Sequence, residues 1–431
     1  MKKYSPIFAI CIFVVFLVLQ SLLHIENKKI LKYLDDYSSP LTLGHYHDYN
    51  GLSLLKNDLI QSQIFLSGEY HGTQLNNDVR LKLLTYLHQN SEQLIYLAEW
   101  PYSFTELVNI YLDTGNESII NHLFSFLEGT FLYSNEDYEF IKKVYDYNQA
   151  YTLENQIRFK GIDIEYDYIA FFYLSSLVSQ HPHQEFGPII LRLTQYAKQQ
   201  SKRSFSEEEI RFIDELYQDL QDNRDIYENK LGEDYFSYSF TLSNLYHGTQ
   251  LYYEYYEKDQ KKFFIQREKK KYRNFKALFN LNQFANYYGQ FGSVHIHQQK
   301  YRDYEFSKDD YRLAHMINEY PPLKNKVTSI VITYEDSFVL DVTGKNEKGF
   351  SFKTNYNQKH FTTINKDHTA VMYKLNGNNS PFDKKRLILK NGDSVTTDYF
   401  QYVIHLRNSQ ATTLFQKNSE LPSNINWSDI R

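Results

Sequence analysis

Four short apolar segments, separated by helical patterns, constrain the fold of this chain more than any other feature. Their lengths suit buried β-strands, and the stretches between them repeat apolar side chains at helical spacing. Strands that alternate with helices form βαβ units, in which the strands run parallel. The sequence therefore predicts an α/β fold with a mainly parallel central sheet and flanking helices. The predicted strands are residues 63–67, 94–98, 157–162 and 293–296.

Two further parts complete the predicted organisation. Residues 165–285 show mostly helical patterns and predict a helical cap over the sheet. Residues 326–431 are β-rich, and we expect them to form an antiparallel C-terminal extension of the same domain, with a small separate domain as the alternative. The strand-like segments there are residues 328–333, 338–342, 386–390 and 402–406, and Asn391-Gly392 is typical of a hairpin turn. The predicted units are residues 1–30, 31–325 and 326–431.

The N-terminal segment carries an apolar run over residues 6–23, preceded by Lys2 and Lys3. Such a run just reaches the roughly 17–25 residues that a bilayer-spanning helix needs. The small residues of a signal-cleavage site are missing at its end. We therefore expect a single-pass anchor in the cell membrane, with the body outside the cytoplasm. Secretion after cleavage of a signal segment is the alternative.

Composition excludes several classes of chemistry. The only cysteine, Cys11, lies in the N-terminal apolar run, so the body has no disulfide, cysteine nucleophile or thiolate metal site. A net charge of −5 gives no basic face for nucleic acid, and we expect no such partner. The sequence does not specify the oligomeric state.

Ionisable residues follow the predicted strands. Ligands bind beyond the carboxyl ends of strands in open α/β sheets, so these side chains are expected to share one site. His295 and His297 alternate on the fourth predicted strand and should point to opposite faces, and we favour His295 for the site. The strand-end residues are Glu69 with His71, Glu99, Asp163 and His295.

Three helical residues are expected to point toward the same site. Arg80 shares a helix face with leucines three, four and seven residues later, so it should be buried against a carboxylate, Glu69 or Glu99. Arg267 and Asn274 are seven residues apart on one inward stripe. The adjacent run Lys269–Lys271, by contrast, is expected to form a solvated helix face.

These residues together resemble the erythromycin-esterase-like branch of the Tiki/ChaN-like superfamily. The motifs that carry the resemblance are Gly68-Glu69-x-His71-Gly72-Thr73 followed by Arg80, Tyr96–Trp100, Phe159–Asp163, Arg267-Glu268 with Asn274, and Gly292–His295. The resemblance implies a parallel-sheet core under a helical cap. It also implies metal-free lactone hydrolysis with His71 as the base, surrounded by Glu69, Arg80, Glu99 and His295. Asp163, Arg267 and Asn274 would support the site or bind substrate.

One departure keeps alternatives open. The esterases have two residues between the glutamate and histidine of the first loop, whereas only Tyr70 stands there in this chain. The shorter form is more similar to the haem-binding ChaN branch and the metal-dependent Tiki peptidases. A peptidase would hold zinc, manganese or cobalt on Glu69, His71, Glu99 and His295, because imidazole and carboxylate ligands suit these ions. A haem- or small-ligand-binding protein without turnover is the third hypothesis.

The leading hypothesis is an extracytoplasmic hydrolase without a cofactor. Its substrate would be a small molecule or peptide containing an ester, lactone or amide bond. No cysteine lies in the body and no Gly-x-Ser-x-Gly elbow is present, so water is the expected nucleophile. His71, neutral near pH 7, would take a proton from that water, while Arg80 and His295 would face the developing oxyanion.

Overall fold

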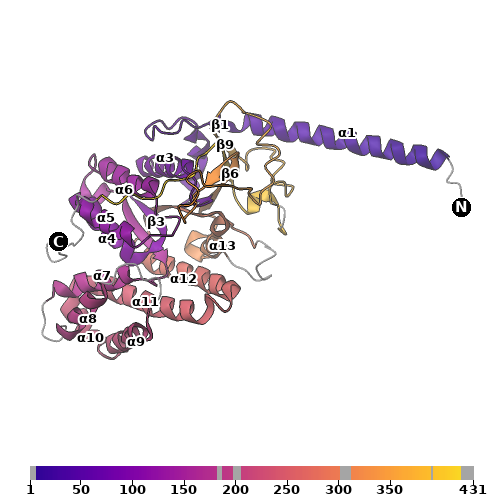
Figure 1. Ribbon diagram of the computed structural model, residues 1–431. Helices are drawn as coiled ribbons and strands as arrows, with labels where there is room; N and C mark the ends of the chain where they lie inside the picture. Colours follow the sequence, from indigo (N-terminus) through magenta and orange to yellow (C-terminus); the bar gives the residue numbers. More distant parts are fainter. Residues whose placement is uncertain (1–5, 182–186, 198–204, 301–311, 390–391, 419–431) are drawn as a thin grey trace, which may run out of the picture.

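An eight-stranded sheet forms the centre of the molecule (Figure 1). The computed structural model describes residues 6–181, 187–197, 205–300, 312–389 and 392–418. The strands follow the order β1-β9-β10-β6-β2-β5-β3-β4 across the sheet. They are β1 (Ser38–Pro40), β2 (Ile64–Glu69), β3 (Leu94–Pro101), β4 (Arg158–Asp163), β5 (Asn286–Gly292), β6 (Val327–Glu335), β9 (Ala370–Lys374) and β10 (Tyr402–Arg407).

The sheet is mainly parallel, which confirms the predicted fold class. Strands β10, β6, β2, β5, β3 and β4 pair in parallel, and β9 pairs antiparallel with both β10 and β1. The C-terminal strands β6 and β10 thus join the parallel part, and the antiparallel pairs lie at the edge of the sheet. A further antiparallel pair joins β7 (Phe338–Val339) to β8 (Phe350–Ser351). No strand forms at residues 386–389, where Leu389 makes only an isolated bridge to Tyr356, and part of the predicted Asn391-Gly392 turn lies outside the described residues.

Helices flank the sheet and form the predicted cap. The flanking helices include α3 (Leu75–Gln89), α4 (Tyr102–Thr114), α5 (Glu117–Ser125) and α6 (Asn135–Asn148). The cap lies to one side of the sheet in Figure 1 and comprises α7 (Tyr168–Ser179), α8 (Gly187–Ala197), α9 (Glu207–Asp222), α10 (Arg224–Leu231), α11 (Tyr235–Tyr255) and α12 (Gln260–Leu281). On α9, Phe212, Leu216 and Leu220 are buried at helical spacing, and a Ser206–Glu209 capping box starts the helix. Two short helices, α2 (Lys56–Gln61) and α13 (Leu313–Asn318), complete this set.

The fourth predicted strand is displaced. Residues 293–296 form a 3-10 turn, and the strand is β5, which ends at Gly292. The sequence pattern missed β5 because Asn286, Gly289 and Gln290 interrupt its apolar residues. The turn packs directly on β2, where a Cβ atom at Gly68 would collide with the Ile296 side chain. Glycine at position 68 therefore lets the turn that carries His295 approach the end of β2.

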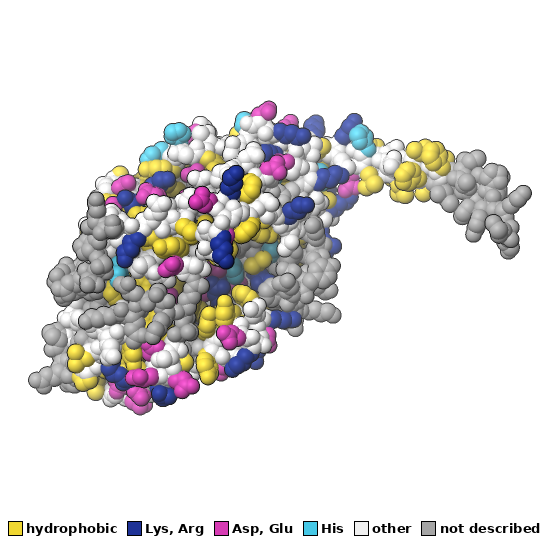
Figure 2. Space-filling view, in the orientation of Figure 1, with side chains coloured by type: hydrophobic (Ala, Val, Ile, Leu, Met, Phe, Trp, Pro, Cys, Tyr) yellow, Lys and Arg dark blue, Asp and Glu magenta, His cyan; other side chains and the backbone are white. Residues whose placement is uncertain are grey.

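Helix α1 (Pro6–Asp36) projects from the body, and hydrophobic side chains lie along its projecting part (Figure 2). The predicted membrane anchor at residues 6–23 is wrong, because no helix in the described part of the chain is long and apolar enough to cross a bilayer. This finding also corrects the predicted single-pass location and membrane partner.

Candidate active site

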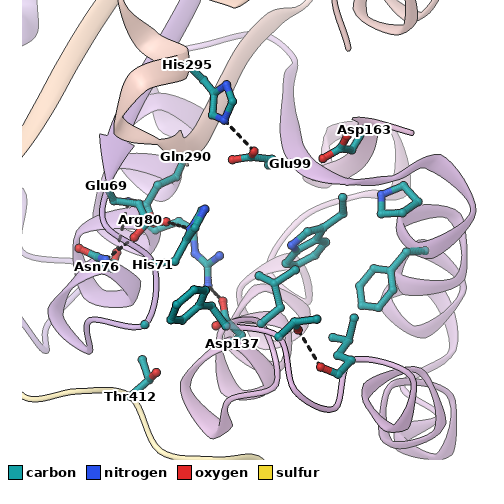
Figure 3. A pocket seen from close by; sticks show the side chains of 18 of the residues that line it. Glu69, His71, Asn76, Arg80, Glu99, Asp137, Asp163, Gln290, His295 and Thr412 are labelled. Carbon is teal, nitrogen blue, oxygen red and sulfur yellow. Dashed lines mark hydrogen bonds and ion pairs between the residues drawn. The ribbon is translucent and has the colours of Figure 1, made fainter. Parts of the chain in front are cut away.

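A cavity of about 500 Å³ lies at the carboxyl ends of β2, β3 and β4 and beside the turn after β5 (Figure 3). These four strands are neighbours in the sheet, so their ends meet at one edge. Most of the residues proposed from the sequence line this cavity. They are Glu69, His71, Arg80, Glu99, Asp163, Arg267 and His295, whereas Asn274 is not among the lining residues.

Glu69 and His71 form a hydrogen-bonded pair at the end of β2. Glu69 Oε1 accepts from His71 Nδ1, and the other carboxylate oxygen accepts from the Asn76 side chain. The loop turns at Gly72, whose φ of +79° favours glycine. About 41% of the His71 side chain is exposed, and no hydrogen-bond partner of its Nε2 lies in the described part of the chain. This nitrogen is therefore left for a ligand or a water molecule.

The Glu69 pairing determines the charge of His71. Desolvation disfavours the imidazolium, but the negative charge and hydrogen bond of Glu69 outweigh it and raise the pKa of His71 to about 9. The expectation of a neutral imidazole near pH 7 is therefore wrong for this arrangement. Neutral His71 makes up only about one hundredth of the population at pH 7 and becomes the major form above about pH 9.

His295 lies opposite His71 and is held between two carboxylates. Its Nδ1 is 2.7 Å from Glu268 Oε1, and its Nε2 is 3.0 Å from Glu99 Oε1. Burial alone would lower the pKa of His295, but the charges of Glu268 and Glu99 raise it. The Nε2 atoms of His71 and His295 both lie within 3.6 Å of the position that a Cβ at Gly292 would occupy, so at most about 7 Å separates them.

His297 takes no part in this cavity. Its Nε2 lies 3.0 Å from the Tyr356 hydroxyl, and burial lowers the pKa of His297 to about 3. The two histidines were expected to diverge because of strand alternation. They do diverge, but His295 belongs to a 3-10 turn and His297 follows it.

Lys271 is a central residue of the site, although its sequence pattern predicted a solvated position. Its side chain is fully buried, so the predicted solvated face at Lys269–Lys271 is wrong for this residue. Its Nζ lies 2.6 Å from Glu99, 3.6 Å from Glu268 and 3.7 Å from Asp163. The spacing contained the signal, because Lys271 is four residues after Arg267 and three before Asn274 and so shares their inward stripe.

Cations around the two central carboxylates keep them ionised. Burial opposes ionisation of Glu99, but His295 and Lys271 outweigh it and hold the pKa of Glu99 well below its usual range. The same two residues outweigh the burial of Glu268 and lower its pKa to about 2. Arg267 makes a two-pronged contact with Asp163, in which Nε donates to Oδ1 over 2.8 Å. The carboxylates of Glu99, Glu268 and Asp163 are thus each in contact with a positively charged side chain behind the cavity.

Arg80 pairs with a carboxylate other than the two proposed. Its guanidinium donates to Asp137 Oδ1 over 2.7 Å and lies 3.7 Å from the centre of the Phe140 ring. Glu69 and Glu99 were the expected partners, but Glu69 is bonded to His71 and Asn76. Asp137 comes from α6, and its sequence neighbourhood gave no sign of this contact.

Asn274 supports the end of β4 from behind. Its side-chain amide donates to the carbonyl of Ile162 over 3.0 Å and to that of Asp163 over 3.3 Å. It also bonds to Asn244 Oδ1 of α11 over 3.1 Å. This residue therefore joins the cap to the strand end that presents the Asp163 carboxylate.

Asn76 positions the Glu69 carboxylate, although no sequence pattern marked it as a site residue. Besides Glu69, its amide bonds to the Tyr70 carbonyl over 2.8 Å, and its Oδ1 accepts from the Tyr334 hydroxyl over 2.6 Å. We expect Asn76→Ala to lower the free energy of unfolding by about 1–3 kcal/mol, because buried polar partners lose their hydrogen bonds. Urea denaturation measures this loss.

The matched control is Asn90→Ala at the exposed C-terminal end of the same helix. Its effect should stay within about 0.5 kcal/mol, as for most surface substitutions. Equal losses for the two variants would show that Asn76 has no special structural role.

The proposed metal ligands do not fit a metal ion. In the described part of the chain, no group of three or more His, Cys, Asp or Glu side chains is arranged to hold one. Glu99 is in contact with Lys271, and both ring nitrogens of His295 face carboxylates. A divalent cation here would have to displace buried positive charges from their partners, which is unfavourable at short range.

Comparisons with known proteins identify the fold. No family model matches the chain, and no curated protein matches it significantly. A crystal structure of a Bacillus cereus protein aligns with 90% of this chain and 99% of its own, at 14% identity and a TM-score of 0.67. A succinoglycan biosynthesis protein aligns with 90% of this chain and 98% of its own, at 15% identity and a TM-score of 0.64.

The third similar structure is an erythromycin esterase, the kind of protein that the motifs of this chain resemble. A variant of erythromycin esterase EreC in its open conformation aligns with 85% of this chain and 95% of its own, at 11% identity and a TM-score of 0.61. The chain therefore has an erythromycin-esterase-like fold, as the resemblance of its motifs predicted. At these identities the likeness concerns the fold alone.

Proposed function

We propose that this protein is a hydrolase that cleaves an ester or lactone, or an amide, with water activated by His71. The observation that carries the proposal is the Glu69–His71 pair, whose second ring nitrogen is open to the cavity. Glu69 fixes the ring through Nδ1, which leaves Nε2 as the nitrogen that exchanges a proton with water. An esterase among the proteins of similar fold supports the reaction class.

The neighbouring charges suit an attack on a carbonyl group. Arg80 lines the cavity as a buried cation and would stabilise the oxyanion as it develops. His295 is held between Glu99 and Glu268, so in this proposal it supplies positive charge rather than acting as a second base. Asp163 and Arg267 line the same cavity and would contact more distant parts of the substrate.

The pH dependence of hydrolysis tests this assignment. The base must be neutral, and the pKa of His71 is about 9, so kcat/KM should rise about tenfold per pH unit below pH 9 and level off above it. Glu69→Gln removes the charge that raises this pKa and should move the rising limb to lower pH. The measurement is the rate of acid release from ethyl acetate at constant pH, corrected for spontaneous hydrolysis.

Glu92→Gln, just before the amino end of β3 and therefore far from the cavity, is the matched control and should keep the wild-type profile. An enzyme profile that is flat from pH 6 to 9, or one that Glu69→Gln does not move, would show that His71 is not the base.

A further inference from the structure

A second cavity, of about 760 Å³, adjoins the candidate active site. The two cavities share lining residues and therefore lie directly side by side. The shared residues are Leu127, Thr130, Tyr166, Asp167, Phe264 and Arg267. Each volume lies within the range of about 300–1,000 Å³ that is typical of small-molecule sites.

Stacked aromatic rings line the second cavity, beginning at Tyr166, which is one of the residues shared with the first cavity. Tyr166 stacks on Tyr252 with ring centres 5.7 Å apart and planes inclined by 9°. Tyr252 stacks in turn on Tyr256 at 4.2 Å and 13°, and Phe263 meets both of these rings edge-on. Tyr256 is 39% exposed and forms the outer end of this row. Because the stacked rings cover the faces of Tyr252, the flat apolar surface that this row leaves for a ligand is at its two ends, Tyr166 and Tyr256.

Two charged side chains, Arg267 and Asp167, lie where the two cavities meet. Arg267 keeps its guanidinium on Asp163 through Nε and one terminal nitrogen, and it lines both cavities. Asp167 also lines both, although one of its oxygens already accepts from the backbone of Ile169 over 3.0 Å. A purely aromatic ligand would remove water from these groups without replacing its hydrogen bonds, which is costly.

A sugar ring matches this combination of surfaces. A pyranose presents a face of C–H groups, which packs on an aromatic ring, and a rim of hydroxyls, which can donate to Asp167 and accept from Arg267. We propose that the second cavity binds the pyranose ring of a carbohydrate ester whose acyl group reaches His71. This inference rests on the proposed hydrolysis.

The reaction would balance as an ordinary ester hydrolysis. The water oxygen bonds to the acyl carbon and its proton passes to His71. The bond between the acyl carbon and the sugar oxygen then breaks, and that oxygen takes the proton. The products are a carboxylic acid and a free sugar hydroxyl.

The test compares three acetates by acid release. They are ethyl acetate, which has no ring, a mono-acetylated methyl pyranoside, and 2-naphthyl acetate. We expect kcat/KM to be at least about tenfold higher for the pyranoside than for ethyl acetate. Tyr256→Ala should raise the KM for the pyranoside about two- to tenfold, the range of one aromatic contact, with a much smaller effect on ethyl acetate. Tyr256→Phe, which keeps the ring, should restore the KM.

Tyr253→Ala is the matched control, since Tyr253 is 64% exposed on the same helix and does not line the cavity. Thermal melting confirms that each variant is folded. Equal kcat/KM values for the pyranoside and ethyl acetate, or a lower KM for 2-naphthyl acetate than for the pyranoside, would overturn the sugar subsite while leaving the hydrolase intact.

Calorimetric titration with maltose separates the two proposals. If no acetate is hydrolysed, the proposed ester hydrolysis fails, and binding of maltose that Tyr256→Ala weakens still supports the subsite. If no acetate is hydrolysed and maltose does not bind, the subsite is overturned as well.

Discussion

Replacing His71 by alanine is expected to lower kcat/KM for ester hydrolysis by about 10²- to 10⁴-fold, the contribution of a positioned general base. The loss should fall mainly on kcat, because proton transfer occurs in the transition state. His71 is also the charged partner of the buried Glu69 carboxylate, so the free energy of unfolding should fall as well near pH 7, and less at pH 9, where His71 loses its proton. Steady-state kinetics at pH 9 and urea denaturation measure the two quantities separately.

His368→Ala is the control for this variant, since His368 is exposed and lies outside the candidate site. It should retain wild-type kinetics. A loss of less than about tenfold in His71→Ala would show that another group activates the water, because a general base contributes at least about 10²-fold.

Lys271→Met is expected to have the largest effect on stability. Lys271 is fully buried and lies within 3.7 Å of Glu99, Glu268 and Asp163. Its removal leaves these carboxylates with an uncompensated buried negative charge, which costs about 3–5 kcal/mol of unfolding free energy. Denaturation in urea measures this loss.

Lys269→Met provides the matched comparison, because Lys269 is exposed on the same helix two residues away. It should shift the free energy of unfolding by no more than about 0.5 kcal/mol. If Lys271→Met were as stable as Lys269→Met, the buried charge network would not contribute as we infer.

Many of the residues that line the candidate site could be predicted, because the sequence patterns that mark strand ends are local. Glu69, Glu99 and Asp163 each end a short apolar run, and the end of a run is visible without knowing which strands pair. His295 was included although its strand was misplaced by several residues. The error arose because β5 is buried yet contains Asn286, Gly289 and Gln290, so its apolar pattern is weak.

The partners of the charged residues were harder to predict. Arg80 was expected on a strand-end carboxylate, but it pairs with Asp137 from α6. Lys271 looked like part of a solvated run, although it contacts carboxylates from β3, β4 and its own helix. A charge is stable in the interior only beside an opposite charge, and that neighbour can come from any segment of the chain.

The sequence by itself determined the class of fold, the helical cap and the loop that joins Glu69 to His71. These features depend on the period of apolar side chains and on residues two positions apart, which are local properties of the chain. Only the tertiary structure decided that β5 lies between β2 and β3, so that His295 faces His71. It also decided the charge of His71, because a pKa depends on the groups that packing brings within a few ångströms and not on the order of residues.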